Sequence, residues 1–230
     1  MEADGFLFNL TTWVVPLVFA IVLHEISHGW VANAFGDPTA KELGRLSPNP
    51  IRHVDPFGTV ILPLVLAISG VPVFGWAKPV PVVAERMRNP RLHMMLVALA
   101  GPGINLALAL VTGFVLAFVA ATADQPPGFA TQFLFANLTN FLLINVFLAI
   151  FNLLPVPPFD GGHVVEGLLP RPLAKKWRAM GRYALFILIF LLLILPAISP
   201  ELDVVEWLVV PPVRVVLQAI AGLAGLGGAG

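Results

Sequence analysis

Long apolar runs recur along this chain, and they restrict its fold more than any other feature. Such runs span the ~30 Å hydrocarbon core of a bilayer. Only helices and closed barrels satisfy their backbone there, and the alternating pattern of barrel strands is absent. With 58% hydrophobic and 11% charged residues, the chain is expected to be an all-α polytopic membrane protein with about four to six transmembrane helices. The expected spans cover about 6–35, 92–121, 133–154 and 183–198, and the apolar segment 204–226 is either a kinked crossing or an interfacial segment.

A shorter apolar run at 57–74 departs from this pattern. It carries Pro63, Gly70 and Pro72, so it is expected to be a re-entrant or broken hairpin rather than a full crossing. The polar stretch before it, 38–56, holds prolines that exclude a long helix, and its length predicts short extended pieces or an edge strand. A short extended stretch is therefore expected near the cytoplasmic side.

The basic residues predict how the chain sits in the membrane. Twelve of the 13 Lys and Arg residues fall in three loops, at 36–57, 75–93 and 155–182. By the positive-inside rule all three loops are cytoplasmic, which requires 57–74 to enter and leave on one side. The N-terminus is then outside, and His28 lies toward the cytoplasmic half of the first span, so that the site opens toward the cytoplasm. The formal net charge of zero gives no indication of a nucleic-acid partner.

The first span contains the motif His24-Glu25-Ile26-Ser27-His28. Positions i and i+4 of a helix share a face, so both imidazoles can bind one Zn²⁺ while Glu25 stays free beside a bound water. Zinc lowers the pKa of such a water to about 7, and a nearby carboxylate can take its proton. Ionisable groups at membrane depth are costly unless they are paired or ligated, which favours a metal site over a packed polar cluster.

A catalytic zinc normally takes three protein ligands, and the chain has no cysteine to supply one. The candidates are the remaining histidines and acids near membrane depth: His53, Asp55, His93, Asp160 and His163. Asp160 is the strongest on physical grounds, because prolines break the helix before it and Gly161-Gly162 permits close backbone approach. His163 is expected to be a turn residue or a partner that orients Asp160, and His53 and His93 are assigned to loop and interface roles.

Two separated elements together form a family pattern. The late element Asn152-Leu-Leu-Pro-Val-Pro-Pro-Phe-Asp160-Gly161, following His-Glu-x-x-His in the first span, resembles the site-2 protease family of intramembrane zinc metalloproteases. The stretch Gly101-Pro-Gly-Ile-Asn105 is similar to that family's G-P-x-x-N element, and the Lys78-Pro-Val-Pro loop is similar to bacterial members. The resemblance runs from about residue 15 to 170.

The resemblance implies a role for each matching residue. His24, His28 and Asp160 are the expected ligands of one Zn²⁺ per chain. Glu25 is the expected general base, and Asn152 the expected donor to the oxyanion. Read without the resemblance, Asn152 can equally cap its helix or bond a neighbouring one. Asn105 is expected first to serve close helix packing together with Gly101 and Gly103, and Asn145 is expected to be structural.

The leading hypothesis is an intramembrane zinc endopeptidase that cuts a transmembrane segment of another membrane protein, expected to be single-pass. An alternative is a membrane metal-ion transporter or sensor that uses the same ligands, but the later spans lack a chain of ionisable residues to carry an ion across. An inactive relative that only holds membrane clients is a third possibility, against which the intact Glu25 weighs.

The chain is expected to form one transmembrane protease domain over 1–230. Its catalytic core covers about 6–170, and accessory C-terminal helices cover about 183–226. No PDZ or CBS module, which the family often carries, is expected. The predicted location is a prokaryotic cell membrane, with the lipid bilayer as a permanent partner.

Overall fold

The computed structural model describes residues 2–69, 75–123 and 127–226, and within these ranges the chain is helical without a strand. The α-helices are α1 (Glu2–Ala34), α2 (Thr39–Glu42), α3 (Leu62–Ser69), α4 (Pro90–Thr122), α5 (Phe129–Asn152), α6 (Asp160–Leu168), α7 (Arg171–Met180), α8 (Ala184–Ile189), α9 (Leu195–Ile198) and α10 (Val210–Ala224). Short 3-10 or π segments extend or join them: η1 (Pro50–His53), η2 (Pro56–Ile61), η3 (Ala84–Arg86), η4 (Gly181–Tyr183), η5 (Phe190–Ile194), η6 (Pro200–Leu202) and η7 (Val205–Val209). The predicted all-α class is confirmed.

Five helical segments of the described chain are long and apolar enough to cross a membrane: Gly5–Ala34, Pro90–Thr122, Phe129–Asn152, Arg171–Ile198 and Val205–Ala224. Their number falls within the predicted range, and the polytopic membrane fold is confirmed. Pro16 lies inside α1 and Pro102 inside α4. Membrane helices tolerate such prolines because neighbouring helices and local adjustments satisfy the backbone groups that proline leaves unpaired.

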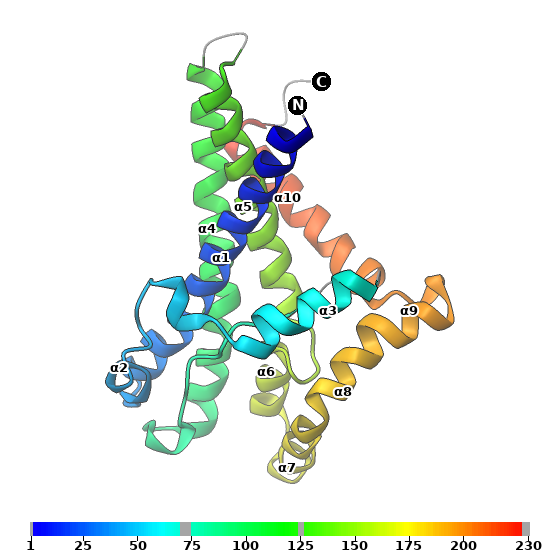
Figure 1. Cartoon of the computed structure of the whole chain (residues 1–230). Coiled ribbons are helices and arrows are strands. Elements are labelled where there is room, and N and C mark those ends of the chain that lie inside the picture. The colour runs from blue at the N-terminus through cyan, green and yellow to red at the C-terminus, as the bar shows by residue number, and fades with distance from the viewer. Residues whose placement is uncertain (1, 70–74, 124–126, 227–230) are drawn as a thin grey trace.

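Helices α1, α4 and α5 form the centre of the molecule, and α10 packs along α4 and α5 (Figure 1). The core between them includes Ala109 of α4, Val146 of α5 and Ile220 of α10. A side chain at Gly113 of α4 would collide with Ile220, so these two helices approach through a glycine, as membrane helices commonly do. The C-terminal segment, whose place the sequence left open, therefore joins the central bundle.

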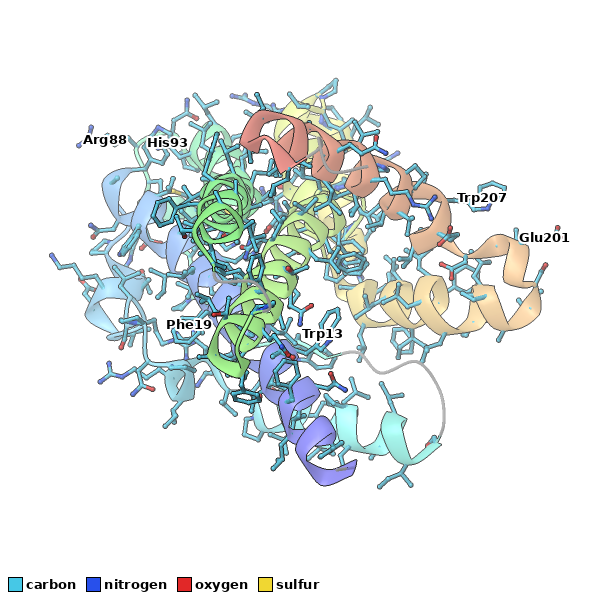
Figure 2. All side chains as sticks on the ribbon, turned by 90° about the horizontal axis from the view of Figure 1, so that it is seen from above. Trp13, Phe19, Arg88, His93, Glu201 and Trp207 are labelled. Carbon is cyan, nitrogen blue, oxygen red and sulfur yellow. The ribbon has the colours of Figure 1, made fainter. Side chains whose placement is uncertain are left out.

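The segment Arg171–Ile198 touches that bundle only partly, with Leu188 packed against its core. None of its side chains is buried in the protein. Figure 2 shows Glu201 and Trp207, which follow this segment, at the edge of the molecule opposite Arg88 and His93. Helices with so little protein contact depend on lipid to cover their apolar surface.

Helix α1 ends at Ala34, close to the end of the expected span at about residue 35, and Gly36 turns the chain. Gly36 has a φ of 109°, a left-handed conformation that glycine adopts without strain. The next residue, Asp37, is buried and accepts hydrogen bonds from Thr39 and from the backbone N–H of Val83, the latter at 2.6 Å. Burial raises the pKa of the Asp37 carboxyl, but the hydrogen bonds from Thr39 and Val83 outweigh burial and hold the pKa below its ordinary value. Asp37 thereby ties the end of α1 to a distant loop.

The apolar run at 57–74 leaves from and returns to one place, as expected for a re-entrant hairpin. Its outgoing part forms η2 and α3, and residues 70–74 lie outside the described ranges. The returning chain pairs with the outgoing one: the Trp76 N–H donates to the Gly58 carbonyl at 3.1 Å, and the Thr59 hydroxyl donates to the Trp76 carbonyl at 2.8 Å. This closure agrees with an entry and exit on the same side.

The edge strand considered for the polar stretch 38–56 does not form. That stretch holds α2 and η1 instead, because Pro50 suits the first position of a helical turn and the Asn49 side chain caps it by accepting the Ile51 N–H at 3.0 Å. Backbone that is neither helix nor strand follows the hairpin at residues 75–83. We call this segment the strap. The predicted short extended stretch therefore does not form as a strand within the described residues, and irregular backbone follows the hairpin.

The three basic loops gather at one end of the molecule. Figure 1 shows α2, the chain leading into α4, and the α6–α7 pair at one end of the molecule. The start of α1, the end of α10 and the adjoining ends of α4 and α5 lie at the opposite end. The distribution of basic residues predicts that the three loops lie on one side of the membrane, which requires them to be at one end of the molecule.

Candidate metal centre

His24 and His28 of α1 meet Asp160 at the first position of α6. Nε2 of His24 lies 3.2 Å from Oδ2 of Asp160, and Nε2 of His28 lies 3.5 Å from the same oxygen. One ligand atom from each residue falls within 4.8 Å of the others. The side chains of His24, His28 and Asp160 are 8%, 12% and 16% exposed, respectively, so the cluster is mostly but not completely buried. The structure brings together the motif histidines and the strongest of the third-ligand candidates.

Acceptors on α4 orient both imidazoles. His28 Nδ1 donates to the Val97 carbonyl at 2.7 Å, and His24 Nδ1 donates to Asn105 Oδ1 at 2.5 Å. With its hydrogen on Nδ1, a neutral imidazole carries a lone pair on Nε2. Two nitrogen lone pairs and a carboxylate oxygen therefore face one another. The Oδ2 atom of Asp160 is buried and accepts no hydrogen bond from any described residue, which leaves a cation as the partner this cluster lacks.

These residues fit a zinc ion. Ligand atoms at ~2.0–2.1 Å from a tetrahedral zinc lie about 3.3 Å apart, and the separations to Asp160 are 3.2 and 3.5 Å. Two imidazoles and one carboxylate form a donor set that leaves the fourth position open, as catalytic zinc sites do. A carboxylate ligand must be ionised, and a cation held between Asp160 and the two imidazoles would favour that form.

Two glycines permit the close approach of the elements that carry these ligands. A Cβ on Gly101 of α4 would lie 2.6 Å from both His24 Nε2 and His28 Cε1. A Cβ on Gly161, directly after Asp160, would collide with the backbone carbonyls of Leu153 and Leu154. Only a residue without a side chain fits either place. The short Asp-Gly helix start can therefore fold back against the end of α5 and present Asp160 to α1.

A chain of buried amides leads away from His24. Asn145 of α5 donates its Nδ2 to the Phe141 carbonyl at 2.8 Å, so its Oδ1 is free to accept from Asn105 Nδ2 at 2.6 Å. Asn105 then turns its Oδ1 toward His24. Because a carbonyl oxygen cannot donate, this order fixes the hydrogen of His24 on Nδ1. The sequence assigned Asn105 and Asn145 to packing or structure; Asn105 touches a candidate ligand directly.

Replacing Asn105 should weaken metal binding without removing a ligand. We expect Asn105→Leu to lower zinc affinity about 10- to 100-fold, because residues that orient a ligating histidine typically contribute this much. Asn105→Asp should restore much of the affinity, since its carboxylate also accepts the Nδ1 hydrogen. Asn137→Leu is the matched control, because the side chain of Asn137 bonds the Phe133 carbonyl of its own helix and no ligand. Competition with a fluorescent chelator measures all four proteins, and equal affinity in Asn105→Leu and the control would contradict the assignment.

The strap crosses α1 beside Glu25. The backbone N–H of Val80 donates to Glu25 Oε2 at 2.8 Å, and a Cβ on Gly29 would lie 2.9 Å from the Val80 side chain. The largely buried Arg45 holds the strap in place by donating to the Lys78 carbonyl at 2.7 Å. One oxygen of the Glu25 carboxylate is thus positioned by protein, and the other stays available for a proton.

The other predicted site residues lie outside the three-ligand cluster. Asn152 donates its Nδ2 to the Leu148 carbonyl of its own helix at 2.9 Å. His163 faces Glu166, with 3.7 Å between Nδ1 and Oε2. His53 is buried with Nε2 against the Ser47 carbonyl, and His93 stacks on Phe35. His163 lies inside α6 rather than in a turn, His53 lies in the short η1 segment and His93 in the first turn of α4. Among the described residues, no hydrogen bond joins Asn152 to the three ligands.

Comparison with known proteins agrees with this geometry. The model of peptidase family M50 matches residues 12–195. A Bacillus subtilis (strain 168) protein named "Putative zinc metalloprotease YwhC" is 38% identical over 183 residues, which cover 80% of each chain. Two mycobacterial proteins named "Putative zinc metalloprotease Rip2" are also similar. The one from Mycobacterium tuberculosis (strain H37Rv) is 32% identical over 212 residues, covering 90% of this chain and 74% of the relative. The one from Mycolicibacterium smegmatis is 30% identical over 196 residues, covering 84% and 69%.

No solved structure matches the chain. The family match extends from the first membrane helix through Asp160 and into the C-terminal helices, and it therefore includes every residue of the cluster. The chain belongs to peptidase family M50 and is a zinc metalloprotease of the site-2 type.

Proposed function

We propose that His24, His28 and Asp160 hold one zinc ion per chain and that the protein is an endopeptidase acting inside the membrane. One observation carries this proposal: two imidazole nitrogens and a buried carboxylate oxygen, which has no hydrogen-bond donor in the described part of the chain, converge from α1 and α6. Glu25 follows His24 directly in the same helix turn, so the cluster has a carboxylate beside it that is not needed as a ligand.

Each residue around the cluster has its own role in the proposed peptide hydrolysis. Zinc, when bound, supplies Lewis acidity to a carbonyl oxygen and lowers the pKa of a water molecule. Glu25 takes the proton of the attacking water on its free oxygen and returns it to the leaving amine. Val80 keeps the Glu25 side chain oriented, and Asn105 keeps His24 in the ligating tautomer. Asn152 serves as a donor to the developing oxyanion in this proposal, which requires its amide to leave the Leu148 carbonyl.

The depth of the cluster supports a substrate that is itself a membrane segment. His28 lies six residues before the last residue of α1, about 9 Å along the helix at 1.5 Å per residue. This is the end at which the basic loops gather. We propose that this end is cytoplasmic, that the N-terminus is outside, and that water enters from the cytoplasm. A single-pass transmembrane helix cut here has to unwind first, because its carbonyls are engaged in i to i−4 hydrogen bonds.

A metal-ion transporter with the same ligands is less well supported. Within the described ranges, His24, His28 and Asp160 form the one cluster of three such residues close enough for a metal. Transport needs further polar sites along a path across the bilayer. The strap holds Glu25 next to the ligands. A carboxylate in this position can act as a general base in hydrolysis, whereas a transporter that only binds the metal does not need it.

Zinc analysis of the purified protein tests the ligand set. We expect about one zinc per chain in the wild type and loss of zinc in Asp160→Ala, because two histidines alone rarely retain the metal. Glu201→Ala, which removes a carboxylate from the exposed η6 segment, is the control and should keep its zinc. Mass spectrometry of the detergent-purified proteins gives the stoichiometry. A full zinc content in Asp160→Ala would place the third ligand elsewhere and remove the basis of the proposal.

A further inference from the structure

Helix α7 is amphipathic and largely uncovered by the rest of the protein. Leu173, Trp177 and Met180 recur at i, i+4 and i+7 and share a face, whereas Arg171, Lys175 and Arg178 recur at the same spacing on the opposite face. Leu173 is 50% exposed and Met180 40%. Short helices with this division lie in the membrane interface, with the apolar face in lipid and the basic face among headgroups.

The charged residues of α7 and η4 themselves are all basic. Residues 171–182 contain five basic residues and no acidic one: Arg171, Lys175, Lys176, Arg178 and Arg182. The chain continues from α7 through η4 directly into the apolar segment of α8, which holds α7 at the membrane boundary. A dense cluster of Lys and Arg beside a membrane helix matches the negative headgroups of anionic phospholipids.

Two contacts connect α7 to the helix that carries Asp160. The Trp177 indole N–H donates to the Gly162 carbonyl at 2.9 Å. Arg178 pairs with Glu166, with 2.6 Å between Nη2 and Oε1. Gly162 lies only two residues after Asp160, and Glu166 lies at the other end of the same short helix α6. A shift of α7 is therefore passed to both ends of the Asp160 helix.

Little else fixes the position of α7. None of its residues is buried, and a cavity of about 360 Å³ lies between α7, α6 and the loop before Asp160. The cavity is lined by Pro158, Phe159, His163, Trp177 and Arg178 among others. A helix with no buried side chain and with open space behind it moves at low cost, since few contacts are lost.

We propose that α7 binds anionic phospholipid headgroups through its basic residues and thereby sets the position of Asp160. The headgroups hold the basic face of α7 at the membrane surface, and the Trp177 and Arg178 contacts carry that position to α6. Loading of the metal site and peptide hydrolysis then depend on the lipid charge around the protein. The regulatory part of this inference rests on the proposed function, whereas the lipid binding does not.

Lipid binding is tested on the full chain by native mass spectrometry with added phosphatidylglycerol or phosphatidylcholine. We expect Lys175→Gln/Lys176→Gln to lower phosphatidylglycerol affinity by about 30-fold, since each basic residue near an anionic surface contributes about fivefold. Lys41→Gln/Arg88→Gln removes two exposed charges from the other basic loops and is the matched control, expected to bind as the wild type does. Equal phosphatidylglycerol affinity in the two double variants would overturn the binding site, and would leave an acidic protein segment as the partner of these charges.

The connection to Asp160 is tested with Trp177→Phe, which keeps the aromatic ring and loses the hydrogen bond to Gly162. In nanodiscs of phosphatidylcholine with or without phosphatidylglycerol, we expect anionic lipid to slow zinc release to a chelator several-fold in the wild type. Trp177→Phe should bind the lipid normally but release zinc at the same rate in both nanodiscs. A lipid effect that persists in Trp177→Phe contradicts the connection. Absence of proteolysis in every nanodisc would count against the proposed function and leave both of these readouts intact.

Discussion

Glu25→Gln should abolish cleavage while the protein keeps its zinc. Glutamine has nearly the shape of glutamate, and its carbonyl oxygen can still accept the Val80 N–H that positions Glu25. What it lacks is a basic oxygen to take a proton from water. General acid–base groups contribute about 10²- to 10⁴-fold to rate, and a loss of that size is expected here. The two imidazoles and Asp160 are unchanged in this variant, so zinc binding should match the wild type.

The measurement is cleavage of a single-pass model substrate by protein reconstituted in liposomes, followed by gel and by mass of the products. Glu85→Gln makes the same chemical change at an exposed position of η3 and should cleave normally. Zinc content measured on the same samples separates loss of the base from loss of the metal. Wild-type cleavage by Glu25→Gln would exclude Glu25 as the base and, with it, the mechanism proposed for this site.

The parts of the fold that could be predicted are those encoded over short stretches of sequence. The spans at α1, α4 and α5 follow from runs of apolar residues, and the histidine pair follows from a spacing of four on one helix. The end of α1 falls one residue before the end of the expected span, and Gly36 then takes a left-handed conformation that suits glycine. The common side of the basic loops follows from charge, which acts on each loop separately.

The parts that could not be predicted depend on contacts between distant residues. Asn105 lies 81 positions from His24, and an asparagine in a membrane helix satisfies its amide in many ways. One signal was present: Gly101 and Asn105 are four apart, like His24 and His28, so that a small residue and an amide share the face of α4 that meets the histidines. Val80 lies 55 positions from Glu25 and donates through its backbone, which no residue type reveals.

The prediction of an edge strand was wrong for a related reason. Prolines in the stretch 38–56 exclude a long helix, but they do not exclude a single turn, and Pro50 begins one. A strand also needs a partner with free backbone groups. The strap gives this stretch one backbone hydrogen bond, from the Lys78 N–H to the His53 carbonyl at 2.8 Å. Its neighbouring backbone groups bond the side chains of Asp37, Arg45 and Glu25 instead.

Gly101→Ala should displace the ligands although it changes none of them. The new Cβ would lie 2.6 Å from His24 Nε2 and from His28 Cε1, well inside the ~3.5 Å at which carbon and nitrogen atoms pack. Overpacking of this kind typically costs about 1–3 kcal/mol, and here the strain falls on the two ligating rings. We expect zinc affinity to fall by about 10- to 100-fold, as that cost implies.

Gly103→Ala separates this effect from the general consequences of replacing a helix glycine. Gly103 lies two residues further along α4, and a Cβ there has no atom within 4 Å. Alanine favours a helix over glycine by up to about 1 kcal/mol, so Gly103→Ala should unfold at the same or a higher temperature and bind zinc normally. Thermal unfolding with and without chelator, together with zinc affinity, compares the two variants. If the two variants bind zinc equally well, α4 does not press against the histidine pair, and the metal site has more room than its distances indicate. If only Gly101→Ala loses zinc, the tight contact between α1 and α4 helps to hold the metal.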